Sequence, residues 1–224
     1  MVLKLYLDML SQPGRALYIF LKVTKTPFEA CAVSLLKGEH LSKKYEQECS
    51  KFKKLPVIHH DDFRLTESVG ILRYIAREFP IEDHWYPKNS QKQALVDEYL
   101  EWHHSNIRQT CLDFFRNQWI IPLRTGKEPS AEESARHKKN MLRSLKDFER
   151  LFLSDMPFIH GNEISFSDLQ AACEIEQPRF AGYDPRRDFP KIKVWIENVR
   201  QECNPYYDEA HQYLYDEAEK RITQ

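Results

Sequence analysis

Glycine is scarce in this sequence, with six residues among 224, whereas soluble proteins average about 7%. Because glycine supplies the positive φ angles of tight turns, the shortage argues against a β-barrel or sandwich and favours long helices. Long apolar runs are also missing. The longest run, residues 16–21, is far shorter than the ~20 residues needed to span a bilayer, so we expect no membrane insertion.

Cysteine is present, but without the spacing of a structural site. The five cysteines are odd in number and widely spaced, and none forms a CxxC pair. This argues against a disulfide framework and against a cysteine-based zinc site. The nine histidines form no metal-binding pattern either, so we expect no metal. Reduced thiols are typical of the cytosol, and residues 1–10 lack the features of a secretion signal. We therefore predict a cytoplasmic protein.

An excess of either charge is lacking too. The chain has 33 Lys and Arg against 34 Asp and Glu, a formal net charge of -1. A balanced chain gives no reason to expect nucleic acid or an anionic membrane as its partner. The length suits one large domain or two small ones.

The first 80 residues carry both strand and helix patterns. Leu3, Leu5 and Leu7 alternate with other residues at the period of a strand, and Pro13 suits the first turn of a helix reaching about residue 23. Further patterns predict a strand over 28–35, a hairpin of 56–58 with 63–65, and a helix over 68–79. The order predicts an α/β domain over residues 1–80.

Beyond residue 80 the periodicity is helical throughout. Two prolines within 80–88 indicate a linker, which we place at 81–88. Apolar residues three and four positions apart predict helices over 95–119, 141–152, 166–177 and 192–203. We therefore predict an all-helical domain over residues 89–224.

Ser11 stands between the first strand and the first helix. A helix N-terminus favours anions because its free N–H groups and its dipole point outward. Serine is also a favoured N-cap residue, so the position has a purely structural explanation as well. No GxSxG motif surrounds Ser11, which argues against an acyl-transfer nucleophile.

Two other segments have both a structural and a ligand-binding interpretation. Pro56 opens a strand, either after a cis peptide bond or at a sheet edge. Thr66-Glu67-Ser68 begins a helix, where Ser or Thr caps the helix or the free amides bind a carboxylate. Lysines between 37 and 54 alternate with glutamates, so a solvated face explains them as well as a binding surface does.

Four motifs occur together in one order and at one spacing: S-Q-P-G-R-A after the first strand, K-G-E-H near 40, K-K-L-P-V near 55 and L-T-E-S-V-G-I-L near 68. With them the chain resembles the cytosolic glutathione transferases over its whole length. It looks closest to the theta class, with an insect member as a further hypothesis. Residues 165–169 are similar to the capping motif of that family's second domain, where Ser165 and Asp168 would form a capping box.

The resemblance implies a thioredoxin-like α/β N-terminal domain, an all-α C-terminal helical domain and a homodimer. It implies glutathione as co-substrate, with no tightly bound cofactor. Ser11 would be catalytic, donating its hydroxyl hydrogen to the sulfur of glutathione. The residues that would bind the tripeptide are Gln12, His40, Lys54, Leu55, Glu67 and Ser68. A cis Pro56 would present the backbone of Leu55 to the cysteinyl part.

The chemistry of glutathione suits these assignments, because the tripeptide carries two carboxylates and one ammonium. Lys54 and His40 suit the glycyl carboxylate, whereas the Ser68 hydroxyl and nearby amides suit the γ-glutamyl carboxylate. Glu67 suits the ammonium. Tyr6 competes with Ser11, since other classes use a tyrosine near the end of the first strand, but the S-Q-P-x-R pattern favours the serine. Cysteine-type relatives are excluded, because neither residue 10 nor residue 11 is Cys.

The electrophile site of the family lies between the domains. We expect a small apolar electrophile there, and the candidates are Leu10, Leu35, Ile107, Arg108, Cys111, Phe115 and Trp119. Four of them recur at i, i+4, i+8 and i+12 on one helix, a stripe that plain core packing also explains. Arg108 steers an anionic leaving group or pairs with an acid.

Three departures from the family pattern matter. Leu41 stands where some theta relatives have a lysine for the glycyl carboxylate, which predicts weaker binding at that end. Ser105 stands where some have an acid that reaches the partner subunit's glutathione. The chain ends at Gln224, before the extra helix of longer relatives. We therefore expect an open pocket, and residues 205–224 folded over the cleft would contradict this.

Two functions from different classes follow. In the first, the chain is an enzyme of detoxification whose bound glutathione thiolate attacks a small electrophile or a peroxide. In the second, it is a non-catalytic binding or scaffold protein that retains the fold. Ser11 together with Lys54, Glu67 and Ser68 favours the enzyme.

Overall fold

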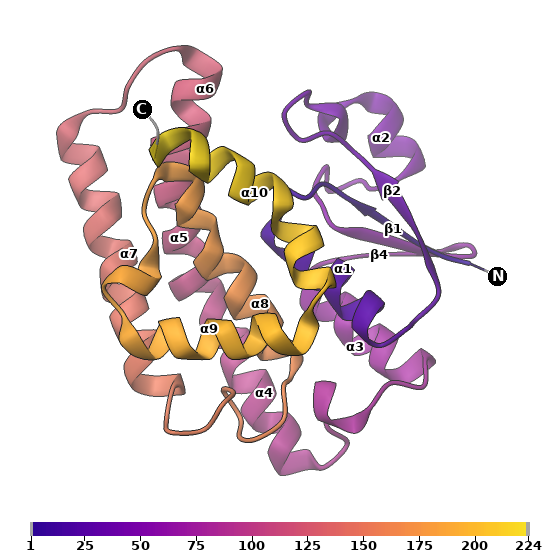
Figure 1. Cartoon of the computed structure of the whole chain (residues 1–224). Helices are drawn as coiled ribbons and strands as arrows, with labels where there is room; N and C mark the ends of the chain where they lie inside the picture. The colour runs from indigo at the N-terminus through magenta and orange to yellow at the C-terminus, as the bar shows by residue number, and fades with distance from the viewer. Residues whose placement is uncertain (1, 223–224) are drawn as a thin grey trace.

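The structure is a computed structural model that describes residues 2–222. Two unlike halves lie side by side, with the sheet on the right of Figure 1 and the long helices on the left. None of the helices in the described range is long and apolar enough to cross a membrane. The halves correspond to the predicted fold class, an α/β half followed by an all-helical half.

The N-terminal half is a four-stranded mixed sheet with three helices. Its elements are β1 (Leu3–Leu7), α1 (Gln12–Val23), β2 (Phe28–Ala32), α2 (Lys43–Glu48), β3 (Val57–His60), β4 (Phe63–Thr66) and α3 (Ser68–Glu78). The strand order is β2-β1-β3-β4. β1 pairs parallel to β2 and antiparallel to β3, and β3 pairs antiparallel to β4. The predicted β-α-β and β-β-α order is present, and the long connection between the two parts contains α2, which was not predicted.

The strand predicted over 28–35 is shorter in the structure. β2 ends at Ala32, although the amide of Val33 still bonds to the carbonyl of Leu7 at 2.9 Å. The amide of Leu35 instead donates to the Asp8 carboxylate at 2.7 Å. A side-chain acceptor thus replaces the next backbone partner, and the strand pairing stops there.

The C-terminal half is helical throughout. Its α-helices are α4 (Ser90–His103), α5 (Gln109–Phe115), α6 (Ile121–Thr125), α7 (Ala131–Phe152), α8 (Phe166–Glu176), α9 (Pro190–Cys203) and α10 (Tyr206–Ile222). Two π-helical turns, His104–Arg108 and Arg116–Ile120, join α4, α5 and α6 into one continuous run. The helix predicted to end near 119 therefore continues to Thr125, where Gly126 in the left-handed region (φ 66°) closes it.

The segment predicted as a linker is firmly packed. Asp83–Trp85 forms a 3-10 turn, and the Trp85 side chain is 3% exposed. Its ring meets Phe20 of α1 edge-on at 5.5 Å. The connection between the two halves is thus anchored under α1.

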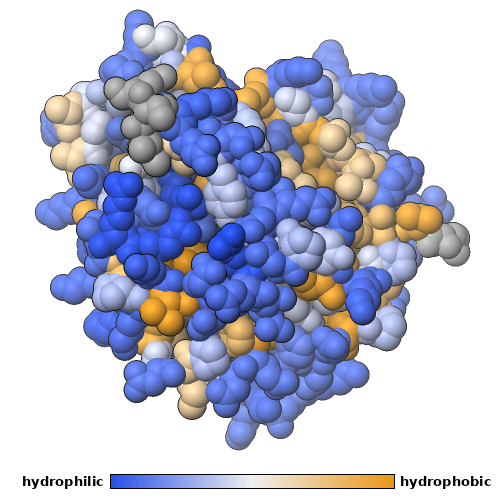
Figure 2. Space-filling view, viewed as in Figure 1, coloured by the Kyte–Doolittle hydropathy of each residue, from blue (hydrophilic) through white to orange (hydrophobic). Residues whose placement is uncertain are grey.

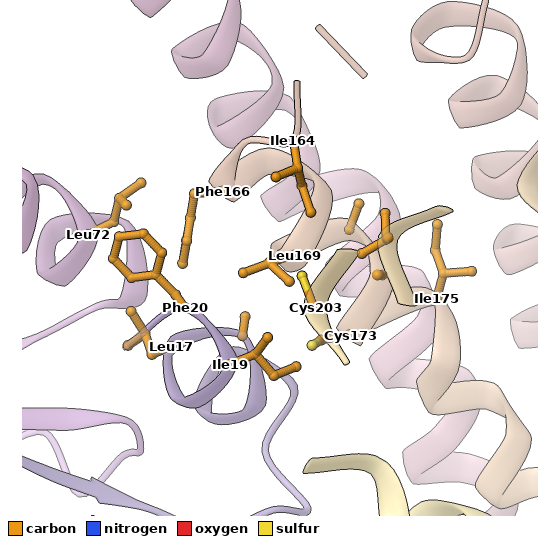
Figure 3. Packing of buried hydrophobic residues seen from close by; sticks show 14 of the residues in the cluster. Leu17, Ile19, Phe20, Leu72, Ile164, Phe166, Leu169, Cys173, Ile175 and Cys203 are labelled. Atoms are coloured by element: carbon orange, nitrogen blue, oxygen red, sulfur yellow. The ribbon is translucent and has the colours of Figure 1, made fainter. Parts of the chain in front are cut away.

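A single core runs across the two halves. Leu3, Leu5 and Leu7 of β1 bury their side chains together with α1 and with the apolar face of α3. On the side of α1 that faces α8, the ring of Phe20 meets that of Phe166 edge-on at 5.3 Å (Figure 3). Every residue of α8 is buried, so α8 is the central helix of the molecule.

All five cysteines are free. Cys49, Cys111, Cys173 and Cys203 are buried, and only Cys31 is partly exposed. The sequence alone did not reveal the exposure of Cys49 and Cys203, and neither side chain is accessible in the fold.

Candidate active site

Ser11 lies at the N-terminus of α1, where its Oγ accepts a hydrogen bond from the Gly14 amide at 3.3 Å. It is therefore the N-cap of the helix, with extended backbone angles (φ -83°, ψ 116°). A hydroxyl that accepts one bond still has its hydrogen to donate. Capping and donation to a ligand are thus compatible roles.

Gly14 allows the backbone to approach Ser11 closely. A Cβ at this position would lie 3.2 Å from the Ser11 Oγ and 3.3 Å from the Asp8 carbonyl oxygen. Both separations are tighter than ordinary carbon contacts. The glycine of the S-Q-P-G motif therefore keeps room for the serine hydroxyl.

Asp8 holds the turn that leads into Ser11, and sequence reasoning did not identify it. Its Oδ1 accepts from the Leu10 amide at 2.9 Å, and its Oδ2 accepts from the Leu35 amide at 2.7 Å. An Asp directly after a strand is a common turn residue because its side chain bonds nearby amides. That signal predicts the bond to Leu10, but only the fold brings Leu35 within reach.

Arg15 supports the same turn from inside the molecule. Its guanidinium is 0% exposed and donates from Nη1 to the Met9 carbonyl at 2.7 Å. From Nη2 it donates to the Cys173 carbonyl of α8 at 2.9 Å. A buried arginine thus fixes the segment before Ser11 to the helical half, a role with no local sequence signal.

Three strands bring several of the predicted glutathione residues to the same end of the sheet. Tyr6, Val57 and Thr66 are paired across β1, β3 and β4. Ser11 follows β1, Leu55 precedes β3, and Glu67 and Ser68 follow β4. These residues therefore leave the sheet at the same end.

The Leu55–Pro56 peptide bond is cis, as the resemblance implied. Beside it, the Tyr45 hydroxyl donates to the Lys54 carbonyl at 2.7 Å, while the Lys54 side chain is exposed. The segment before β3 is thus held in place with its lysine turned to solvent.

Glu67 has an unusual backbone conformation, with φ 69° and ψ 113°. Such angles strain a residue other than glycine, and this kind of strain concentrates at ligand sites. Glu67 is exposed, whereas Ser68 is 7% exposed at the first turn of α3. The Glu67 carboxylate therefore faces solvent, whereas the Ser68 hydroxyl lies at the N-terminus of α3.

Gln12 and His40 each contain a buried polar atom with no partner in the described part of the chain. These atoms are Nε2 of Gln12 and Nδ1 of His40. Buried polar groups are normally hydrogen-bonded, so both atoms are available to a ligand or to water.

Tyr6 lies on the opposite face of the sheet from α1. Neighbouring strand residues point to opposite faces, and Leu5 and Leu7 face α1 while Tyr6 packs beside Cys49 and Val57. Its ring centre is 4.5 Å from that of His59. Burial raises the pKa of Tyr6, and the Cys31 and Cys49 thiols raise it further. Tyr6 is poorly placed to replace Ser11.

The electrophile candidates divide between two parts of the core. Leu10, Phe115 and Trp119 form one cluster with Phe180 and Leu214, and Leu35 packs against it. Ile107 and Cys111 are 0% exposed and belong to the large core instead. A twelve-residue stripe extends about 18 Å along a helix, so its two ends meet different neighbours. Ile107 and Cys111 stay predictions for the electrophile site, and the structure places them apart from the cluster of Leu10 and Trp119.

Arg108 pairs with an acid, one of its two predicted roles. Its Nη1 contacts the Oε1 of Glu174, a carboxylate that is 0% exposed. Burial raises the pKa of Glu174, and the charge of Arg108 opposes that shift. Arg108 compensates a buried charge and is not left unpaired to steer a leaving group.

The position of α10 contradicts the prediction of an open pocket. α10 lies over the boundary between the halves in Figure 1, and its Leu214 is 1% exposed within the cluster of Leu10 and Trp119. The Tyr18 hydroxyl of α1 donates to Glu209 of α10 at 2.6 Å. The middle of α10 therefore covers the apolar side of the site, and residues 223 and 224 lie outside the described range.

The residues near Ser165 form the predicted capping box. Ser165 and Asp168 bond reciprocally at the start of α8, and the Asp168 carboxylate also accepts from the Ile159 amide and the Trp195 indole, both at 2.9 Å. This motif is structural and fixes the central helix.

A groove of about 910 Å³ lies elsewhere, lined by Glu82, His84, His160 and Glu163 among others. None of the predicted site residues lines it. Volume alone therefore does not identify the site, and the assignment near Ser11 rests on side-chain chemistry.

Comparison with known protein families matches both halves. Residues 1–77 match the glutathione S-transferase N-terminal domain, and residues 88–202 match the glutathione S-transferase C-terminal domain. The two matched ranges leave residues 78–87 between them, and the domain boundaries at 80, 81–88 and 89–224 stay predictions.

Individual relatives are similar over nearly the whole chain. Glutathione S-transferase theta-1 of Bos taurus is 40% identical, with 96% of this chain and 89% of the relative covered. The Homo sapiens theta-1 protein is 39% identical with the same coverage.

Two solved structures share the fold. The apo form of human glutathione-S-transferase T1-1 superposes with a TM-score of 0.92 at 38% identity, covering 97% of this chain and 91% of that one. Human glutathione transferase theta-2, in complex with glutathione and an unknown ligand, gives 0.91 at 36% identity, covering 99% and 90%.

Proposed function

The chain belongs to the glutathione S-transferase family, with theta-class relatives at about 40% identity over most of its length, and from this premise we propose that Ser11 activates the thiol of glutathione. The family membership makes the chain an enzyme that conjugates glutathione. The non-catalytic scaffold alternative is therefore not supported. An insect source stays a prediction, since the relatives compared above are vertebrate proteins.

One observation carries the proposal for Ser11. Its hydroxyl caps α1 as an acceptor, at 3.3 Å from the Gly14 amide, and keeps a hydrogen for a second partner. A glutathione sulfur that accepts this hydrogen bond would also lie near the N-terminus of α1, where an anion is favoured. The thiolate form of glutathione is the group that benefits from both.

The magnitudes are sufficient. A free thiol titrates near 8.5, and the thiolate is the nucleophile. Lowering the thiol pKa by about 1–2 units requires roughly 1.4–2.7 kcal/mol. A hydrogen bond to a charged group contributes about 1.5–3 kcal/mol. One serine hydroxyl therefore makes an appreciable fraction of bound glutathione ionised at neutral pH.

The sheet edge suits the rest of the tripeptide. We place the cysteinyl backbone along Leu55, which precedes β3 and leaves an extended peptide room to pair in the manner of an added strand. The γ-glutamyl carboxylate lies at Ser68 and the first turn of α3, and Glu67 receives the ammonium. The remaining polar contacts to the tripeptide come from Gln12, His40 and Lys54.

The reaction then needs little from the protein beyond positioning. The thiol proton leaves to solvent, and the sulfur forms a bond to an electrophilic carbon. In a substitution the leaving group departs with its bonding electron pair, and in an addition the resulting carbanion takes a proton from water. The apolar cluster of Leu10, Phe115 and Trp119 beside the Ser11 turn suits a small apolar electrophile.

We also propose a homodimer, a cytoplasmic location and a role in detoxification. Phe52 and Phe63 are 53% and 46% exposed, and apolar surface of this kind is common where a second chain packs. The missing acid at Ser105 predicts that this chain does not reach the glutathione of its partner through that residue.

The proposal is tested by the ultraviolet absorbance of the bound thiolate against pH. The wild-type protein should depress the titration of glutathione below that of the free tripeptide, and Ser11→Ala should largely restore it. Ser42→Ala is the matched control. Ser42 also caps a helix, accepting from the Tyr45 amide at 3.1 Å, and its loss should leave the titration depressed.

A depressed titration that survives Ser11→Ala would reject the serine and move the role to the helix amides. A wild-type protein that binds no glutathione would reject the site altogether.

A further inference from the structure

Arg124 reaches from the helical half to the N-terminal half. It is the penultimate residue of α6, two positions before the closing Gly126. Its Nη2 donates to the carbonyl of Leu35 at 3.4 Å, across 89 positions of sequence. Figure 2 shows the surface hollowed between the lobes that carry α6 and α2. Arg124 is exposed. We call the place where it meets residues 34–41 the rim.

The position of the guanidinium is defined by a turn of the N-terminal half. The Leu35 carbonyl also accepts from the Gly38 amide at 3.2 Å, and Gly38 leads directly into the 3-10 turn Glu39–Leu41. Arg124 therefore lies against the turn that carries His40. The two side chains come from different halves and face the same rim.

The acids at this rim are already engaged. Asp8 accepts from the Leu10 and Leu35 amides, and Glu39 accepts from the Ser34 amide at 2.8 Å. Among the ion pairs within residues 2–222, none includes Arg124. Arg124 thus lies near His40 with no carboxylate ion-paired to its guanidinium among the described residues.

The imidazole of His40 has a ring nitrogen without a hydrogen-bond partner. Its Nδ1 is buried and unpartnered in the described residues. The pKa of His40 is lowered, first by burial and then by the positive charge of Arg124, while Asp8 acts in the opposite direction. A bound anion between the two side chains would give Nδ1 a hydrogen-bond partner and would favour the protonated imidazole, opposing the effects of burial and of Arg124.

We infer that Arg124 adds a guanidinium from the second domain at the glycyl carboxylate of glutathione, the group already assigned to His40 and Lys54, so that the second domain contributes directly to co-substrate binding. The inference rests on the proposed glutathione site. A guanidinium is well suited to a carboxylate because it offers parallel N–H donors. Leu41 supplies no charge at the place where the resemblance expects a lysine, and its side chain is 56% exposed. Arg124 takes over that charge from the opposite side of the rim.

The test compares two ligands by titration calorimetry: glutathione, and its amide, in which a neutral carboxamide replaces the glycyl carboxylate. Arg124→Gln should raise the Kd of glutathione about tenfold, the scale of one charge-assisted hydrogen bond. The Kd of the amide should be the same for Arg124→Gln and the wild type. Arg143→Gln is the control, because it removes the same charge from an exposed position on α7 and should change neither Kd.

Arg124→Lys provides a second variant, which should retain part of the preference for glutathione over the amide. Equal weakening of both ligands by Arg124→Gln would overturn the inference in favour of a structural role, and so would unchanged binding of glutathione. If the wild type binds glutathione with a Ser11-dependent titration while Arg124→Gln has no effect, only this inference fails. If the wild type binds neither ligand, the proposed function fails with it.

Discussion

The side chains of Arg15 and Gln177 meet across the boundary between the halves, with Nη2 donating to Oε1 at 2.6 Å. Gln177 returns a bond from its Nε2 to the carbonyl of Leu10 at 3.2 Å. Since Arg15 also holds the Met9 carbonyl, the two residues before Ser11 are both fixed by this buried pair. The position of the serine therefore depends on α1 and on the helical half together.

Replacing Arg15 by Met should destabilise the protein strongly. Met9, Cys173 and Gln177 would each lose a donor in a buried setting, and an unsatisfied buried group costs about 1–3 kcal/mol. We expect a loss of about 3 kcal/mol or more in the free energy of unfolding, measured by urea denaturation. Arg143→Met on the surface of α7 should stay within about 0.5 kcal/mol of the wild type. A loss under 1 kcal/mol for Arg15→Met would contradict the structural role.

Two glycine-to-alanine substitutions should differ in their effect on the pKa of bound glutathione. At Gly14 the new Cβ would press on the Ser11 Oγ at 3.2 Å, so Gly14→Ala should displace the hydroxyl and raise the pKa of bound glutathione by about 1 unit. At Gly70, within α3, a Cβ meets nothing within 4 Å. Gly70→Ala should leave that pKa unchanged and stabilise the helix by about 0.5–1 kcal/mol.

Thiolate absorbance gives the pKa for both glycine variants, and thermal unfolding gives their stability. An unchanged pKa in Gly14→Ala would mean that the helix start adjusts without moving the serine hydroxyl, and the close-approach argument would then be rejected.

Trimming Leu214 should widen the electrophile site. Its side chain is 1% exposed beside Leu10 and Trp119, so Leu214→Ala leaves a cavity and costs about 2–5 kcal/mol of stability. The ratio of kcat/KM for a bulky electrophile to that for a small one should rise about tenfold, the scale of a pocket enlarged by a few methylenes.

The control for this variant is Leu123→Ala on α6, where the side chain is 57% exposed. It should change neither the stability nor the ratio appreciably. If the ratio for Leu214→Ala matched that of the wild type, α10 would not form a wall of the electrophile site.

Local patterns predicted what local physics controls. The alternation of Leu3, Leu5 and Leu7 gave the first strand with its bounds, because a strand with one face in the core repeats every second residue. The start of α1 was also predicted, since Ser11 and Pro13 are favoured at a helix N-terminus. The Ser165–Asp168 capping box was recognisable for the same reason.

Features that depend on distant partners were not predictable. Gln177 lies 162 positions from Arg15, and nothing near either residue indicates the other. Ile107 and Phe115 share a periodic stripe, yet the stripe passes from one cluster into another. The π-helical turn Arg116–Ile120 carries the helix past its predicted end near 119, and no residue pattern there indicates that the helix continues. α10 falls within the predicted all-helical domain, but its sequence pattern does not indicate which face packs on the cluster of Leu10 and Trp119.

α8 has no solvent-facing side, since all of its residues from Phe166 to Glu176 are buried. Its neighbours include Leu17 and Phe20 of α1, so neither half covers its own apolar surface alone. The two sequence families therefore describe ancestry and do not define separate folding units. The chain should melt in one cooperative transition, and an isolated fragment of residues 1–80 should aggregate through the exposed face of α1. For the same reason, insertion of another protein at the junction should destabilise the chain, although the junction looks like a linker in the sequence.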